Sequence, residues 1–516
     1  MNASFVYQVE AKTLNTGLTS QLGKKLGKYR LALDVPEHTA DVQLYDCFDQ
    51  TIQQSNRVLY RSNDQLTLIS QNGLAITQPC DQPVNFVAKL APGQVKTELA
   101  DVSPLRALLA GTKGLQKSVQ GKLLDGNAKT VARLSIQCWA ASPDSNWHCF
   151  ITFEPVRGYV KAQQAVLKAL ANNKALQPHQ VLSPTLIFNA LGYIPSGYDP
   201  KPTLHFKGKP NAITVASQII HTYIDVARAN EAGVIADYDT EFLHDYRVSL
   251  RKVRSVLSLF KGVYSAPQTI SLKQAFSEHM NPTGQLRDLD VYLLEKDRFY
   301  SLLPASLHQG LDLMFTQFEK ERAAHHHKLS KRFASQAYQQ AMAALSAQFS
   351  ANSNVIKPGP QAKHLAASYA QTLIWKRYQK VCKIARAIDA QTPDEQIHEL
   401  RIDCKKLRYL MEFFAPLFAA KSIKALIKSL KVLQETLGLF NDYSVQQESL
   451  QAYLATHANK GTAQHIAIAQ SVGALRSVLS HKQQQERDQV VAKFADFDND
   501  TTRNEFRQLF KQQESS

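Results

Sequence analysis

The chain repeats part of itself at a fixed distance. The segment FLHDYRVSLRKVRSVLSLF, which begins at Phe242, matches QIHELRIDCKKLRYLMEFF, which begins at Gln396, at an offset of 154 residues. The same offset aligns GQLRDLDV, from Gly284, with GLFNDYSV, from Gly438, without a gap. Because two separate segments keep one register, we interpret the pattern as a tandem duplication and predict two similar helical bundles.

The sequence around this duplication has the composition of helices. From about residue 211 onward the chain consists of long amphipathic runs rich in Ala, Leu, Gln, Lys and Arg, with few Gly or Pro to break them. The stretch NSNVIKPGPQ at 352–361 is the most evident break. We therefore predict an all-α domain over 211–512, with one repeat at about 211–350 and the other at about 361–512.

The first part of the chain has a different pattern. Short β-rich stretches such as VYQVEAKTL, KTVARLSIQCWA and WHCFITFEP are separated by Asn, Asp, Gly and Pro, which favour turns. A helical segment, KAQQAVLKALANNKAL, and a Pro/Gly-rich stretch then close the region. This predicts an α+β domain over 1–195, built mainly from antiparallel strands, and a linker at 196–210.

Basic side chains of the repeated helix fall on one stripe. At 100° per residue and with His244 at zero, Arg247, Arg251 and Arg254 lie at about 280–340°, and the apolar residues gather at about 180–220°. The second copy repeats the stripe with His398, Arg401, Lys405 and Arg408. Like charges at i,i+3 and i,i+4 repel each other, so we expect an anion to lie on the stripe.

The residue types indicate phosphate as the anion. Arginine offers a planar fork of donors to phosphate oxygens, lysine a point charge, and a histidine among cations tends towards its neutral, donating form. Two other readings remain open at this point. In the first, the stripe is an ordinary solvated face. In the second, Asp288, Asp290 and Asp442 neutralise the stripe through internal ion pairs. We expect these aspartates to orient some of the arginines instead.

Both copies of the repeated helix resemble the CHAD domain (conserved histidine α-helical domain), whose hallmark reads roughly H-x-x-R-[VI]-x-x-[RK]-[RK]-x-R. The resemblance spans about residues 207–512 and includes RDLDV after the first helix. It implies two helical bundles related by pseudo-twofold symmetry around a basic pore that binds inorganic polyphosphate, and recruitment to polyphosphate granules. The residues that it nominates are His244, Arg247, Arg251, Lys252, Arg254, Arg287, His398, Arg401, Lys405, Lys406 and Arg408. The second copy departs from the first where Asn441 replaces Arg287.

The N-terminal part resembles a CYTH domain, the triphosphate tunnel fold, through YQVEAK, KTVARLSIQ and PVRGYVKA. That resemblance implies a β-barrel or tunnel in which Glu-x-Glu-x-Lys helps to hold a divalent metal against a triphosphate. Here the motif reads Gln8-Val9-Glu10-Ala11-Lys12, and an amide cannot supply the charge that a hard cation favours. We therefore expect a degenerate domain with no catalytic residue, metal or cofactor. The alternative is a metal-dependent inorganic triphosphatase.

The net charge and the length of the apolar runs limit the classes of partner that we expect. Of the formal net charge of +16, residues 1–200 hold 19 basic and 14 acidic side chains, so most of the excess lies in the helical part. Such a surplus attracts polyanions, but the stripe lacks aromatic residues on which bases stack, so we do not expect nucleic acid as the partner. No apolar run is long enough to span a bilayer, and no membrane partner is expected.

Two further patterns bear on location and metal binding. The six cysteines show no CxxC spacing and no signal peptide is evident, which favours free thiols and a cytoplasmic protein. The resemblance to the CHAD domain implies that this protein associates with polyphosphate granules. His325, His326 and His327 follow one another directly, and consecutive helical side chains diverge by 100°, so we do not expect them to hold one metal ion. The sequence leaves the oligomeric state open.

Overall fold

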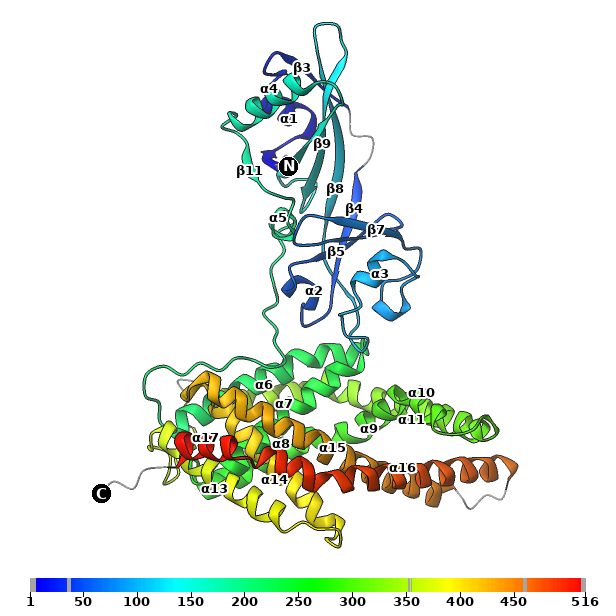
Figure 1. Ribbon diagram of the computed structural model, residues 1–516, viewed down its shortest axis with the longest axis vertical. Helices are drawn as coiled ribbons and strands as arrows, with labels where there is room; N and C mark the ends of the chain where they lie inside the picture. The colour runs from blue at the N-terminus through cyan, green and yellow to red at the C-terminus, as the bar shows by residue number, and fades with distance from the viewer. Residues whose placement is uncertain (1–5, 35–38, 351–352, 354, 458–461, 512–516) are drawn as a thin grey trace. The chain divides into compact units, whose positions relative to one another are not determined.

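The computed structural model describes residues 6–34, 39–350, 353, 355–457 and 462–511 (Figure 1). Contacts between Cα atoms divide the chain into two compact units, Met1–Asp199 and Pro200–Ser516. The first is built on an antiparallel sheet and the second is helical, which confirms the predicted fold class. Among the described helices, none combines the length and the apolar character that crossing a bilayer requires.

The β unit is one continuous antiparallel sheet. The strand order is β11-β1-β10-β9-β8-β4-β5-β6-β7, and β3 pairs with both β2 and the far end of the long strand β8. The strands are β1 (Val6–Ala11), β2 (Lys25–Leu26), β3 (Tyr29–Leu33), β4 (Ala40–Asp46), β5 (Val58–Ser62), β6 (Gln65–Ile69), β7 (Ala75–Pro79), β8 (Leu109–Leu124), β9 (Thr130–Ala140), β10 (Trp147–Pro155) and β11 (Gln177–His179). This arrangement fits the CYTH-like tunnel fold.

Short helices flank the sheet, and strand alternation decides which side chains they cover. They are α1 (Leu14–Leu22), α2 (Thr51–Gln54), η1 (Val87–Lys89), α3 (Gln94–Glu98), α4 (Val160–Ala171) and α5 (Pro184–Ala190). Because successive side chains of a strand point to opposite faces, Tyr7 and Val9 of β1 join a core that includes residues of α1 and α4. Gln8 and Glu10 lie on the other face and are more exposed.

The helical unit begins at α6 and fills the rest of the described chain. Its helices are α6 (Ala212–Ala236), α7 (Thr240–Leu259), α8 (Ala266–Met280), η2 (Asn281–Thr283), α9 (Gly284–Leu294), α10 (Lys296–Ser301), η3 (Ala305–Leu307), α11 (His308–Ala334), α12 (Gln336–Gln348), α13 (Ala366–Arg386), α14 (Asp394–Phe414), η4 (Ala415–Leu417), α15 (Ala420–His457), α16 (Ala463–Phe497) and α17 (Asp500–Phe510). In Figure 1, α10 and α11 extend in the same direction as the ends of α15 and α16. A core rich in aromatic residues joins these segments.

The duplication sets the positions of the helix starts. α6 and α13, α7 and α14, and α8 and α15 begin 154 residues apart in each pair. The copies differ after that, because Pro282 has no amide N–H and lies in the short 3-10 helix η2 between α8 and α9. The equivalent position is Thr436, and α15 runs through it without interruption. One proline therefore turns a single long helix into several shorter ones.

Equivalent residues of the two copies meet each other. The backbone N–H of Ala212 donates to the carbonyl of His364 at 2.8 Å, and the N–H of Ala366 donates to the carbonyl of Pro210 at 2.9 Å. Exchanging the copies turns one of these bonds into the other. Phe260 and Phe414, also 154 residues apart, stack with ring centroids 4.6 Å apart and planes 9° from parallel. These contacts place a pseudo-twofold axis between the copies, as the resemblance implied.

Candidate functional site

The repeated helices α7 and α14 are in contact with each other in the helical unit. The Asp239 side chain caps α7 by accepting the backbone N–H groups of Glu241 and Phe242 at 2.9 and 3.2 Å. Each helix buries its apolar face, represented by Leu250 in the first copy and Leu407 in the second. The basic stripe of each helix lies beside this buried face, so the apolar packing determines where the stripe lies and which way its side chains point.

The structure brings part of the two stripes together. The charge of Arg251, an exposed residue of α7, acts on Arg247 in its own copy and on Arg401 and Lys405 in the other copy. Burial, together with the charges on Arg401 and Arg251, lowers the pKa of Lys405 to about 8. We name Arg247, Arg251, Arg401 and Lys405 the cationic cluster. Each copy contributes the same two positions to it.

Arg247 is held by a residue that the sequence pattern did not single out. Its guanidinium donates to Oγ1 of Thr283 at 2.5 Å, and that hydroxyl, fully buried, donates to the carbonyl of Met280. Burial lowers the pKa of Arg247, and the charge of Asp288 opposes this shift. The available signal was that Thr283 directly precedes the repeated segment GQLRDLDV.

Arg401 is held differently, because Leu437 occupies the position equivalent to Thr283. Its guanidinium instead lies 3.5 Å from the carboxylate of Asp442, which is more than half exposed. The Nε atom of Arg401 is buried and has no hydrogen-bond partner among the described residues. An unpartnered, buried guanidinium N–H favours an incoming acceptor oxygen.

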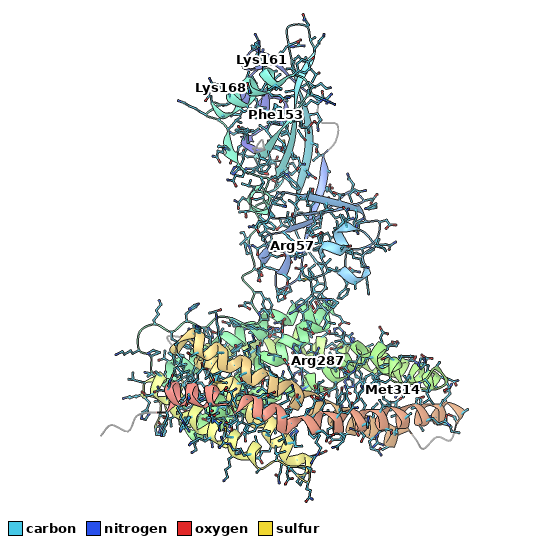
Figure 2. All side chains as sticks on the ribbon, viewed as in Figure 1. Arg57, Phe153, Lys161, Lys168, Arg287 and Met314 are labelled. Atoms are coloured by element: carbon cyan, nitrogen blue, oxygen red, sulfur yellow. The ribbon has the colours of Figure 1, made fainter. Side chains whose placement is uncertain are left out.

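Arg287 of α9, which is labelled in Figure 2, contacts residues at the start of α7. Its guanidinium donates to the carbonyl of Thr240 at 3.3 Å and lies 3.7 Å from the carboxylate of Glu241. In the second copy Asn441 is buried, and its amide is 3.5 Å from Asp442. The asymmetry noted in the sequence is therefore present, and Arg287 serves partly to join two helices.

The other stripe residues lie at the margin of the cationic cluster. His244 is half-buried, whereas His398 is exposed. Arg254 is half-buried and its guanidinium approaches the sulfur of Met280 at 3.5 Å. Arg408 lies 3.8 Å from Glu412 one turn along the helix. These contacts give the two copies unequal surroundings outside the cluster.

Two lysines nominated by the resemblance, Lys252 and Lys406, lie away from the stripe. Lys252 is buried, and its ammonium donates to the hydroxyl of Tyr223 at 2.9 Å while lying 4.4 Å from the centre of that ring. Lys406 lies 3.7 Å from the buried carboxylate of Asp403, on the opposite side of α14 from the cluster. The doubled basic positions of the motif therefore point in different directions, and only the first of each pair joins the cluster.

The aspartates do not neutralise the cationic cluster fully. Asp290 accepts from Arg322 at 2.8 Å rather than from a stripe residue. Within the described ranges, neither Arg251 nor Lys405 has a carboxylate within 4 Å.

His326 of the histidine triplet lies 2.8 Å from the carbonyl of Val234, so its ring is engaged with the backbone.

In the β unit, the residues of the degenerate motif contact histidines. The Nε2 of His179 lies 3.0 Å from Oε1 of Gln8, and His148 lies 3.5 Å from the carboxylate of Glu10. The part of the chain that the structure covers contains no group of three or more His, Cys, Asp or Glu residues arranged to hold a metal ion. All six cysteines are buried, and no disulfide joins them.

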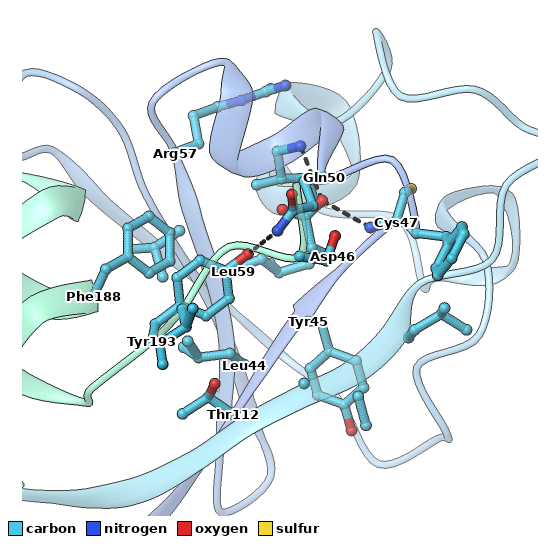
Figure 3. Close-up of a pocket in the computed structure, with 18 residues that line it drawn as sticks. Leu44, Tyr45, Asp46, Cys47, Gln50, Arg57, Leu59, Thr112, Phe188 and Tyr193 are labelled. Atoms are coloured by element: carbon cyan, nitrogen blue, oxygen red, sulfur yellow. Dashed lines mark hydrogen bonds between the residues drawn. The ribbon is translucent and has the colours of Figure 1, made fainter. Parts of the chain in front are cut away.

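A pocket of 460 Å³ in the β unit is lined by apolar residues and a few polar groups (Figure 3). The Asp46 carboxylate there accepts the backbone N–H groups of Cys47, Ile52 and Gln53 at 2.7–2.9 Å. Burial raises its pKa to about 6 in spite of these bonds. Arg57, which lines the pocket, forms an ion pair at 2.7 Å with Asp101, which does not line it. The charged groups of this pocket are thus already used to hold α2 and its surroundings.

We expect repulsion in the cationic cluster to destabilise the folded helical unit. Arg251→Gln should raise its free energy of unfolding by roughly 0.5 kcal/mol at low ionic strength, because it removes like charges next to Arg247, Arg401 and Lys405. The gain should vanish in concentrated salt, which screens the repulsion. Denaturant unfolding followed by the helical circular-dichroism signal measures this. Equal destabilisation of Arg251→Gln at all salt concentrations contradicts it, and Lys328→Gln serves as the control.

A match to a known family agrees with the resemblance noted above, and two solved structures are similar to part of the chain. Residues 218–451 match the sequence profile of the CHAD domain. The crystal structure of the CHAD domain from the plant Ricinus communis is 25% identical, with a TM-score of 0.47, covering 58% of this chain and 96% of its own. PptA from Streptomyces chartreusis is 16% identical, with a TM-score of 0.38, covering 55% and 99% respectively. No curated protein matches the sequence. Residues 218–451, which contain both copies of the repeated His/Arg helix, form a CHAD domain.

Proposed function

We propose that the helical unit binds inorganic polyphosphate at the cationic cluster. The observation that carries this proposal is that the charge of Arg251 acts on Arg401 and Lys405 of the other copy, with no carboxylate within 4 Å of Arg251 or Lys405 in the described chain. Such an arrangement destabilises the free protein, and a linear polyanion that runs from one copy to the other relieves the repulsion. The three arginines of the cluster present planar donor forks to it, and Lys405 adds a point charge.

The surroundings favour phosphate over nucleic acid. The stripe positions carry no aromatic side chain on which bases could stack, so single-strand recognition lacks its usual platform. The unpartnered Nε of Arg401 offers a directed donor to an anionic oxygen. Binding of this kind also provides a physical route by which the protein would associate with polyphosphate granules.

Simultaneous loss of the four cluster charges should abolish most binding. In the full chain, Arg247→Ala, Arg251→Ala, Arg401→Ala and Lys405→Ala together should weaken long-chain polyphosphate binding by roughly 100-fold or more at low salt. Titration at two salt concentrations measures it, and the wild type should lose affinity steeply with salt. A matched variant replaces four exposed lysines away from the repeated helices, namely Lys328, Lys331, Lys421 and Lys424. Equal weakening in both variants would show that net charge alone binds the ligand.

Lys405 should make binding depend on pH. Because its pKa is about 8 in the free protein, the side chain loses its charge as the pH rises above 8. A bound polyanion favours the ammonium form, so binding takes up a proton in that range and affinity should fall by up to about tenfold per pH unit. Lys405→Arg should flatten the profile, since the guanidinium stays charged. Lys328→Arg serves as the control. If polyphosphate affinity falls with pH as steeply in Lys405→Arg as in Lys328→Arg, another group causes the pH dependence.

We propose that the β unit is not an enzyme, and that triphosphatase activity is the alternative. What supports the proposal is Gln8, whose neutral amide faces His179 where the metal-dependent motif has a carboxylate. We expect no phosphate release when the full chain is incubated with tripolyphosphate and Mg²⁺. Release that disappears in Glu10→Gln would establish the alternative, with retained polyphosphate binding as the control for folding.

A further inference from the structure

A second basic groove lies on the helical unit, away from the cationic cluster. It has a volume of 810 Å³ and runs along α13, bounded by the end of α7, the segment before α13 and one residue of α14. The α14 residue is Leu410, which lies about 140° around the helix from Lys405. The groove therefore opens on a different side of α14 from the repeated stripe.

Cations of α13 dominate the rim of this groove. Lys376, Lys380 and Lys383 follow one another at i, i+4 and i+7, so they share one face and span about 10 Å along the helix. Lys261, two residues after the end of α7, lies on the rim as well. The residues that line the groove include no aspartate or glutamate, so the charged side chains of its lining are all basic.

Only some of these charges are compensated inside the protein. Arg377 and Lys380 bind the buried carboxylate of Asp403, and Lys380 also pairs with Glu399 at 2.9 Å. No ion pair holds Lys376 or Lys383 in the described part of the chain, and both side chains are exposed. Arg377 and Lys380 are thus held in place by carboxylates of the protein, whereas Lys376 and Lys383 keep their charges available for a ligand.

Comparison of the two copies shows that the fold does not require these cations. The positions equivalent to Lys376 and Lys383 are Thr222 and Ala229, and Arg377 corresponds to Tyr223, which instead contacts Lys252. α6 and α13 nevertheless begin at equivalent residues. The basic face is a property of one copy, so a structural demand shared by both bundles does not account for it.

The floor of the groove is apolar, which narrows the class of ligand. Leu259 and Leu410 are buried there, Leu373 is half-buried, and the ring of Tyr369 is fixed by its hydroxyl, which donates to the carbonyl of Lys261 at 2.9 Å. An inorganic phosphate chain gains nothing from apolar contact, whereas a ring attached to phosphates does. The volume is within the range of pockets that enclose small organic ligands.

We propose that the α13 groove binds a nucleoside polyphosphate, with its phosphates on Lys376 and Lys383 and its base against Leu373 and Tyr369. The site is separate from the cationic cluster and does not rest on the binding of polyphosphate there. The helical unit then has two anion sites of different chemistry, one shared between the copies and one belonging to the second copy alone.

ATP without a divalent cation is the probe for the phosphate contacts. In the full chain, Lys376→Thr with Lys383→Ala installs the residues of the first copy and should weaken ATP binding by roughly tenfold. Lys328→Ala with Lys331→Ala removes the same charge from exposed positions of α11 and should leave ATP affinity close to that of the wild type. Long-chain polyphosphate affinity should stay within about twofold in both variants. Unchanged ATP affinity in the groove variant overturns the site, and a tenfold loss of polyphosphate affinity makes it an extension of the cluster.

Leu373→Ser tests the contact with the base. Loss of apolar area should weaken ATP binding by about threefold and leave tripolyphosphate binding unchanged, because tripolyphosphate has no ring. Equal effects on both probes, or none on either, would overturn the nucleoside part of the assignment. Photo-crosslinking of the wild type with an azido-ATP gives a separate readout, and labelled residues should lie in α13. Labelling confined to α7 and α14 would place ATP on the cationic cluster instead.

Discussion

The helical unit depends on the contact between equivalent residues of its two copies. The paired backbone bonds of Ala212 and Ala366 and the stacked rings of Phe260 and Phe414 lie where the copies meet. They hold α7 beside α14, because Phe260 directly follows α7 and Phe414 ends α14. Two basic helices would otherwise separate, since their charges repel. The apolar and hydrogen-bonded contact thus holds together a site that electrostatics alone would open.

The site keeps its cations at a cost in stability. Burial lowers the pKa of Arg247, Arg401 and Lys405, and in each case a neighbouring cation lowers it further. The compensating groups are few: the buried hydroxyl of Thr283 and the charge of Asp288 for Arg247, and the exposed carboxylate of Asp442 for Arg401. A chain under selection only for stability has no need of such an arrangement. The imbalance is the physical reason to regard the cluster as a binding site.

The differences between the copies are as informative as their likeness. The second copy has one long helix, α15, where the first copy has α8, η2 and α9, with Pro282 in η2. In the first copy the hydroxyl of Thr283 accepts a hydrogen bond from Arg247. The second copy instead gains a buried Asp403, around which Arg377 and Lys380 gather to form the wall of the α13 groove. Duplication supplied two equal bundles, and later changes gave each its own polar interior. The symmetric positions form the cationic cluster where the copies meet, and the asymmetric ones line the groove of the second copy.

The sequence by itself determined the two-part fold class, the duplication with its 154-residue register, and the stripe of His, Arg and Lys on each repeated helix, because periodicity and offset are local properties of a chain. It could not show that Lys252 turns to Tyr223 and Lys406 to Asp403, since a helical wheel gives directions without neighbours. Nor could it show that the charge of Arg251 acts on Arg401 and Lys405, or that α13 borders a groove. Those facts depend on which faces pack together, and only the tertiary structure decides that, through contacts between residues far apart in the chain.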